Sequence, residues 1–202
     1  MRASMTRAGF RHHPFYCEEN VFHLCSHEAL GERPRSAVFV SGALGGFVMW
    51  HQRAARRPGA PLFWDYHVIL LVEDPWEIWD LDSTLGLPVP AAHYLERSFR
   101  ADVPPEIAPR FRVVPAAELL RTLASDRSHM RRPDGTFDRP PPPWPPISAP
   151  ERGSNLRRFI DTGDAFLGER TSLEGLIERT RGAEAGRGGR AAAPRDRAGG
   201  RG

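Results

Sequence analysis

Three residue types that cysteine acyl-transfer chemistry requires follow one another along this chain. Cys17 opens a segment whose apolar residues recur at helical spacing, and His67 and Asp80 follow on two expected neighbouring strands. At a helix N-terminus, unpaired N–H groups and the helix dipole favour a thiolate, which would lower the pKa of the thiol. A thiol, an imidazole and a carboxylate in this order predict nucleophilic attack on a carbonyl carbon.

The two strands that would carry the imidazole and the carboxylate form a predicted β-hairpin. Residues 62–72 are the strongest strand candidate, and residues 76–81 return after a turn. A turn centred between positions 73 and 74 would put Asp80 opposite His67, at the ~5 Å Cβ separation of cross-strand neighbours. A turn centred one residue later would put Asp82 there instead. The pattern leaves both aspartates open as partners of the histidine.

Each of these residues also has an ordinary structural interpretation. A cysteine at a helix start is often a small buried hydrophobe, a strand histidine is usually structural, and a carboxylate near a strand end often caps a turn. Their combination in chain order resembles the layout of papain-like and transglutaminase-like folds. Cys25 lies about two helical turns beyond Cys17, away from the helix dipole, and is expected to be a core residue.

The remaining pattern predicts an α+β domain in which an antiparallel sheet packs on the helix that starts at Cys17. That helix is expected to run to about Leu30, with Gly31 ending it. Further strands are expected at 37–40, 47–50 and 111–114, and further helices at 116–124 and 172–179. The proline run at 140–146 excludes helix and central strand, and its aromatic neighbours favour a polyproline II segment packed across the domain.

Length and composition predict one domain with two irregular ends. Residues 1–14 are expected to be a flexible leader, 15–180 a single catalytic domain, and 181–202 a disordered Arg/Gly/Ala tail. The sequence lacks the run of about 20 apolar residues that a membrane span needs, and its N-terminus lacks the apolar core of a signal peptide. Two cysteines do not make a disulfide framework. We therefore expect a soluble monomer in the cytoplasm, and also in the nucleus in a eukaryotic source.

The positive charge of the chain is local. Segment 181–202 carries six arginines against two acidic residues, a net of +4, so the rest of the chain contributes −1 to the overall +3. The catalytic domain thus has no general signature of nucleic-acid binding, and neither nucleic acid nor a membrane is an expected partner.

Five motifs, in order from about Tyr16 to about Arg179, resemble the protein N-terminal glutamine amidohydrolases. They are Tyr16-Cys17-Glu18-Glu19-Asn20, Trp64-Asp65-Tyr66-His67-Val68, Asp80-Leu81-Asp82-Ser83, Ser125-Asp126-Arg127-Ser128-His129-Met130 and the Pro-Pro-Pro-Pro-Trp-Pro run. The resemblance implies that Cys17, His67 and Asp80 are the catalytic residues, and so selects Asp80 over Asp82. Only the leader and the tail lie outside the part of the chain that this resemblance covers.

The resemblance also implies the reaction, which is hydrolysis of the side-chain amide of an N-terminal glutamine to give glutamate and ammonia, without a metal or cofactor. Substrates would be polypeptides that begin with glutamine, and the product would feed an N-degron degradation route. The α-ammonium of such a substrate would be bound best by a carboxylate or by a set of carbonyl oxygens, and Glu18, Glu19, Asp65 and Asp126 are the candidate carboxylates. The alternatives are another papain- or transglutaminase-like peptidase or acyl transferase, or a non-catalytic binding module.

Overall fold

A six-stranded antiparallel sheet forms the centre of the molecule. The computed structural model describes residues 9–148 and 153–188. The strands lie in the order β6-β5-β4-β1-β7-β8, and every neighbouring pair is antiparallel. They are β1 (Arg35–Ser41), β4 (Tyr66–Val72), β5 (Glu77–Trp79), β6 (Val89–Pro90), β7 (Arg110–Pro115) and β8 (Glu169–Thr171).

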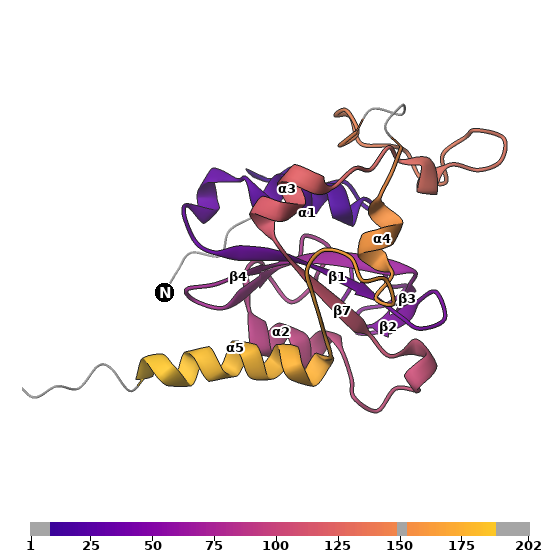
Figure 1. Ribbon diagram of the computed structural model, residues 1–202. Coiled ribbons are helices and arrows are strands. Elements are labelled where there is room, and N and C mark those ends of the chain that lie inside the picture. The colour runs from indigo at the N-terminus through magenta and orange to yellow at the C-terminus, as the bar shows by residue number, and fades with distance from the viewer. Residues whose placement is uncertain (1–8, 149–152, 189–202) are drawn as a thin grey trace, which may run out of the picture.

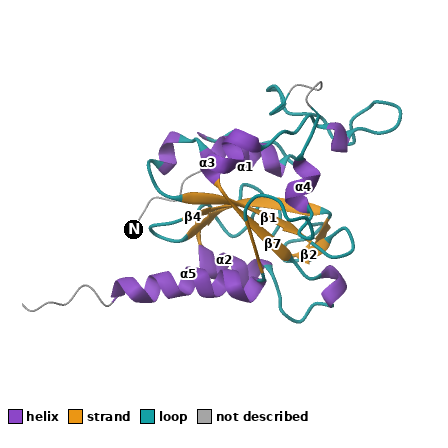
Figure 2. Cartoon of the chain, in the orientation of Figure 1, coloured by secondary structure: helices purple, strands orange, loops and turns teal. Residues whose placement is uncertain are grey.

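Helices cover both faces of this sheet (Figures 1 and 2). One face carries α1 (Cys17–Cys25), α3 (Ala116–Thr122) and α4 (Leu156–Ile160), and the other carries α2 (Ala91–Ser98) and α5 (Leu173–Gly188). Short 3-10 turns occur at Glu28–Leu30, Pro105–Ile107 and Ser128–Met130. The prediction of an α+β domain with an antiparallel sheet against the Cys17 helix is confirmed.

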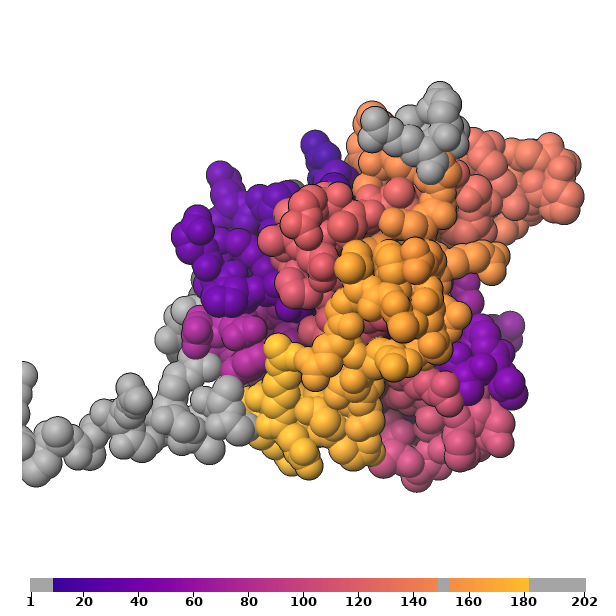
Figure 3. All heavy atoms as spheres, viewed as in Figure 1, coloured from indigo at the N-terminus to yellow at the C-terminus, as the bar shows by residue number. Residues whose placement is uncertain are grey.

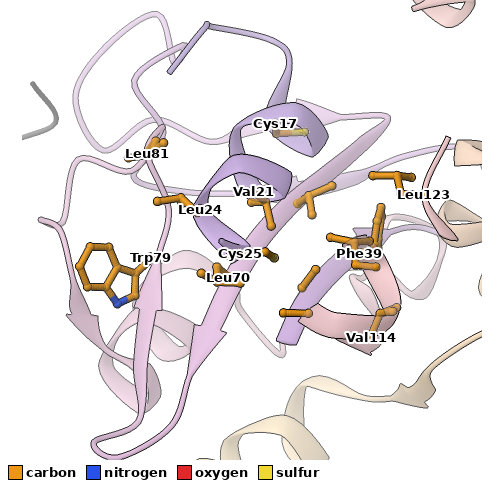
Figure 4. Close-up of a cluster of buried hydrophobic side chains, with 14 of the residues drawn as sticks. Cys17, Val21, Leu24, Cys25, Phe39, Leu70, Trp79, Leu81, Val114 and Leu123 are labelled. Atoms are coloured by element: carbon orange, nitrogen blue, oxygen red, sulfur yellow. The ribbon is translucent and has the colours of Figure 1, made fainter. Parts of the chain in front are cut away.

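The two layers of core follow from the alternation of side chains along the central strands. On β4, Val68 and Leu70 face the α1 side, whereas Ile69 and Leu71 face the α2 side. Figure 4 shows the α1 layer, with Cys17 at one end of the cluster and Cys25 near Leu70. Cys25 is 3% exposed, which confirms its expected place in the core. No side chain caps the start of α1 at Tyr16, and the helix packs on the sheet through its buried apolar residues.

The first helix is shorter than its pattern predicts. It begins at Cys17 as expected but ends at Cys25, and a separate 3-10 turn covers Glu28–Leu30. The side chain of His27 accepts a hydrogen bond from the Ala29 N–H and so starts this new turn. Gly31, at φ 52°, ends the turn in a conformation that glycine adopts without strain.

The long strand predicted at 62–72 is two strands in two different sheets. β3 (Leu62–Trp64) pairs with β2 (Phe47–Met49), while β4 starts at Tyr66 in the main sheet. Asp65 lies between them, and its carboxylate accepts the Tyr66 N–H at 2.9 Å. The chain therefore turns a corner at Asp65, two residues before His67.

The hairpin of β4 and β5 has the later of the two registers considered. Leu70 pairs with Trp79 and Val72 pairs with Glu77, so the turn is centred between positions 74 and 75. The continuation of this ladder would place Asp82 opposite His67. However, β5 ends at Trp79, and the chain leaves the ladder before it reaches either aspartate.

The proline-rich segment packs on the domain, as the sequence predicts. Arg127 donates hydrogen bonds to the carbonyl oxygens of Pro142 (3.4 Å) and Trp144 (2.7 Å). The Trp144 indole N–H donates to Glu19 Oε2 at 2.7 Å, and Arg127 binds both Glu19 oxygens at 2.6 and 2.8 Å. One buried carboxylate on α1 thus binds two later segments to this helix.

Two described segments lie next to the expected domain boundaries at residues 15 and 181. Residues 9–14 contact the domain: Phe10 packs against Trp79, and His12 Nε2 lies 2.8 Å from Asp82 Oδ1. Helix α5 continues to Gly188, nine residues beyond its predicted end. Residues 1–8 of the leader and 189–202 of the tail lie outside the described residues. Among the helices described, none is long and apolar enough to cross a membrane.

A buried arginine fixes the segment between α4 and β8. Arg112, on β7, is fully buried, and its guanidinium donates to four backbone carbonyl oxygens at 2.6 to 3.1 Å. These carbonyls belong to Phe159, Asp161, Asp164 and Leu167. Figure 3 shows this C-terminal part of the chain, orange to yellow, lying across the middle and lower part of the face turned to the viewer.

Candidate active site

A cavity of about 150 Å³ lies where the start of α1 meets the start of β4. Cys17, the first residue of the helix, and His67, the second residue of the strand, both line it. They are 6% and 1% exposed, so the cavity reaches groups that are otherwise buried. The remainder of its wall includes Trp64, Asp65 and Asp82.

His67 is joined to Asp80 through one ring nitrogen. Its Nε2 lies 3.2 Å from Asp80 Oδ1, and both side chains are buried. Nδ1 has no hydrogen-bond partner among the described residues. The neutral ring that fits this geometry carries its proton on Nε2, toward the carboxylate, and leaves a lone pair on Nδ1.

Asp80 is held in place by three further donors. The Gln52 amide (3.0 Å) and the Tyr94 hydroxyl (2.7 Å) donate to Oδ2, and the Asp82 N–H donates to Oδ1 at 2.9 Å. Burial works to raise the pKa of this carboxyl, but His67 and these donors outweigh burial and lower it. The carboxylate therefore stays charged, with a fixed orientation toward the ring.

The environment of His67 favours its cation. Burial works to lower the pKa of the imidazole, but the charge and hydrogen bond of Asp80, with Asp82 and Asp65 nearby, raise it. The indole of Trp64 stacks on the ring with centroids 5.6 Å apart and planes 13° apart. This stacking restrains the imidazole between the indole and the carboxylate.

The pKa of the Cys17 thiol is raised, which contradicts the lowering expected from its position at a helix start. Burial is the largest cause, and the carboxylates of Glu18 and Asp82 add to it. These effects outweigh the local N-terminal dipole, so the resting sulfur is a neutral thiol. His67, whose Nδ1 has no hydrogen-bond partner among the described residues, lines the same cavity as this thiol.

A family sequence model described as N-terminal glutamine amidase matches residues 12–180. The chain belongs to this family. A protein N-terminal glutamine amidohydrolase of Arabidopsis thaliana is 38% identical over 159 residues, 72% of each chain. The Bos taurus protein of that name is 38% identical over 168 residues, 78% of this chain and 80% of its own. The Drosophila grimshawi protein is 41% identical over 155 residues, 72% and 75% of the two chains.

In this member of the N-terminal glutamine amidase family, Glu18 follows Cys17 in the sequence but is not part of the cavity wall. It is fully buried and accepts hydrogen bonds from the Tyr66 hydroxyl (3.0 Å) and the Ser125 hydroxyl (3.3 Å). His129 Nε2 lies 3.4 Å from Glu18 Oε1. Burial raises the pKa of this carboxyl to about 7.

The other three candidate carboxylates occupy different environments. Glu19 is fully buried, with both oxygens bound by Arg127. Asp65 is exposed and lines the cavity together with Cys17. Asp126 lies outside this cavity, in the wall of a larger neighbouring groove, where its Oδ1 accepts the Ser128 N–H at 2.9 Å.

The sequence alone did not assign three residues to this site. Gln52 and Tyr94 come from a loop and from α2, and only the tertiary fold brings them to Asp80. Trp64 belongs to the second of the five motifs, but its stacking on His67 depends on the corner at Asp65. Within the described ranges, no group of three or more His, Cys, Asp or Glu side chains is arranged to hold a metal ion.

Proposed function

We propose that this chain hydrolyses the side-chain amide of glutamine at the N-terminus of polypeptides, with Cys17, His67 and Asp80 as the catalytic triad. The observation that carries the proposal is the His67 ring, which binds Asp80 through Nε2 and has a free Nδ1, in the cavity that Cys17 lines. Membership of the N-terminal glutamine amidase family supports the choice of substrate.

In the first half of the reaction, Nδ1 of His67 takes the thiol proton as Sγ of Cys17 attacks the carboxamide carbon. The oxyanion that forms needs a hydrogen-bond donor. The Cys17 N–H, at a helix start that no side chain caps, is the donor we assign to it. His67 then protonates the nitrogen as the C–N bond breaks, because an amide anion is too basic to leave. Ammonia departs and a glutamyl thioester remains on Cys17.

In the second half, His67 takes a proton from water while the water oxygen attacks the thioester carbonyl. The C–S bond breaks, the proton returns to the sulfur, and glutamate is released. Asp80 stabilises the imidazolium that forms in each half and holds the ring in the tautomer that leaves Nδ1 free. Its lowered pKa supports this role, because a protonated carboxyl would not stabilise a cation.

Selection of a chain end requires a group that binds the α-ammonium, and we assign Asp65 to it. Among the four candidates, this carboxylate lines the cavity with Cys17 and His67, and its side chain forms no ion pair with another described residue. An N-terminal asparagine is one methylene shorter. Anchored at the same carboxylate, its carboxamide would not reach the thiol, so the site would reject it.

We further propose a papain/transglutaminase-like fold, which the nucleophile at the start of a helix against an antiparallel sheet supports. A monomer acting in the cytoplasm, without nucleic acid or a membrane as partner, is part of the same proposal, and its product would enter an N-degron route.

The proposal is tested by incubating the protein with a Gln-initiated peptide and following the ~1 Da mass gain of amide-to-acid conversion together with ammonia release. Cys17→Ala should be inactive. Cys25→Ala is the matched control, since it removes the second buried thiol and should retain turnover. An N-acetylated peptide should not react. Turnover by Cys17→Ala would refute the thiol mechanism.

A further inference from the structure

A groove of about 890 Å³ adjoins the catalytic cavity and shares Asp65 and Tyr66 with it. We propose that this groove binds residues 2 to 4 of the substrate polypeptide, and that Arg110 and Arg157 in its wall favour an acidic side chain near position 4. The inference rests on the proposed function, because it takes the N-terminal glutamine to occupy the small cavity.

The direction of the groove follows from the strand register. Tyr66 pairs with Ser41 and Ser41 pairs with Arg110, and all three residues line the groove. The groove therefore crosses the ends of β4, β1 and β7. Neighbouring strands are ~4.8 Å apart, so Arg110 lies roughly 10 Å from Tyr66 across the sheet.

This span corresponds to a short stretch of extended polypeptide. An extended chain advances about 3.3 Å per residue, so roughly 10 Å holds about three residues. If the first residue is bound at Asp65, beside Tyr66, the fourth lies level with Arg110. The groove has about six times the volume of the catalytic cavity, which suits several residues rather than one side chain.

Charged side chains of both signs line the groove, and the arginines among them have no ion-pair partner in the described part of the chain. Arg110 and Arg157 are exposed, and no ion pair joins either of them to another residue in the described part of the chain. Asp126 and Asp161 also line the groove; each accepts one backbone N–H of its own loop, at 2.9 and 2.8 Å, as Asp65 does, and neither forms an ion pair with Arg110 or Arg157. The two guanidinium groups in the groove wall are therefore without a carboxylate partner in the described part of the chain, and would attract a carboxylate of the peptide.

The far wall of the groove is fixed before substrate arrives. Ile160, Asp161 and Gly163 belong to the segment whose carbonyl oxygens are bound by the buried Arg112. A wall that is already ordered loses little conformational entropy when a peptide binds.

The charge preference is tested with two peptide amides, Gln-Gly-Gly-Glu and Gln-Gly-Gly-Lys. The expected kcat/KM is about two- to fivefold higher for the glutamate peptide at low salt, as for an exposed ion pair, and the difference should shrink at ~1 M salt. The double variant Arg110→Gln with Arg157→Gln should abolish the preference. Arg121→Gln, an exposed arginine of α3 outside the groove, should keep it.

The length of the subsite is tested with Gln-Gly amides of two to six residues. The expected kcat/KM rises up to four residues and then stays level. An equal rate for the dipeptide amide, or equal rates for the two charged peptides with the unmodified protein, would overturn the groove assignment and leave the proposed function intact. If no Gln-initiated peptide is turned over at all, the proposed function itself fails.

Discussion

Asp80 accepts the Nε2 hydrogen bond of His67 although the strand register of their hairpin points to a different residue. Extended past Trp79, the ladder would place Asp82 opposite the histidine. Asp80 reaches the ring because the chain leaves β5 at that point, and Gln52 and Tyr94 hold its second oxygen. The pairing of His67 with Asp80 thus depends on where β5 ends and on two hydrogen-bond donors from distant segments.

Substitution of Asp80 by asparagine should lower kcat/KM by about 10²–10⁴-fold, because an amide neither stabilises the imidazolium nor fixes the useful tautomer. The measurement is ammonia release from a Gln-initiated peptide. Asp82→Asn is the matched control and should lose less than about tenfold, since Asp82 binds His12 rather than the catalytic ring. A larger loss for Asp82→Asn than for Asp80→Asn would reverse the assignment.

The loss of activity at acidic pH should follow the protonation of His67. The ring accepts the thiol proton only when it is neutral, and Asp80 and its neighbours raise its pKa above the usual 6.5. Activity should therefore fall as the pH drops through a midpoint above 6.5. In Asp80→Asn the residual activity should show a midpoint at lower pH. A midpoint well below 6.5 in the unmodified protein would indicate a preformed thiolate–imidazolium pair instead.

Glu18 should make the protein less stable as the pH rises. Its pKa in the fold is about 7, against 4.5 for an ordinary glutamate, so above pH 4.5 the unfolded chain loses a proton that the folded protein retains. The free energy of unfolding should fall by up to about 3 kcal/mol from this group between pH 5 and 8. The measurement is urea denaturation at several pH values. The Glu18→Gln variant should not show this fall in the free energy of unfolding, whereas Glu106→Gln, which changes an exposed residue, should still show it.

Removal of the Arg127 guanidinium should destabilise the domain strongly, because it leaves Glu19 charged and buried without its partner. We expect Arg127→Ala to lower the free energy of unfolding by about 3–5 kcal/mol. Arg132→Ala breaks an ion pair in which both side chains are 52% exposed, and should change it by less than about 1 kcal/mol. Equal effects of the two substitutions in urea denaturation would contradict the buried role of Arg127.

Local patterns in the sequence predicted the elements that local interactions determine. The start of α1 at Cys17 and the strand around 111–114 are such cases, because apolar periodicity and turn residues act over a few positions. The packing of the proline segment on the domain was also predictable, because its aromatic neighbours bury their apolar surface by this contact.

The features that sequence reasoning missed arise from contacts between distant segments. The corner at Asp65 exists because β3 pairs with β2 rather than continuing into β4. The raised pKa of Cys17 reflects burial and neighbouring carboxylates, which helix position alone does not reveal. Helix α2, which supplies Tyr94, was not predicted, so the support of Asp80 could not be predicted either.

The buried guanidinium of Arg112 has a consequence for which substitutions this protein can tolerate. All four of its acceptors are main-chain carbonyl oxygens, in the segment from Phe159 to Leu167. Every amino acid offers that same acceptor, so the anchor is indifferent to which side chains the segment carries. Substitutions in this segment can change the side chains that line the rim of the groove, while Arg112 continues to hold the backbone against the sheet.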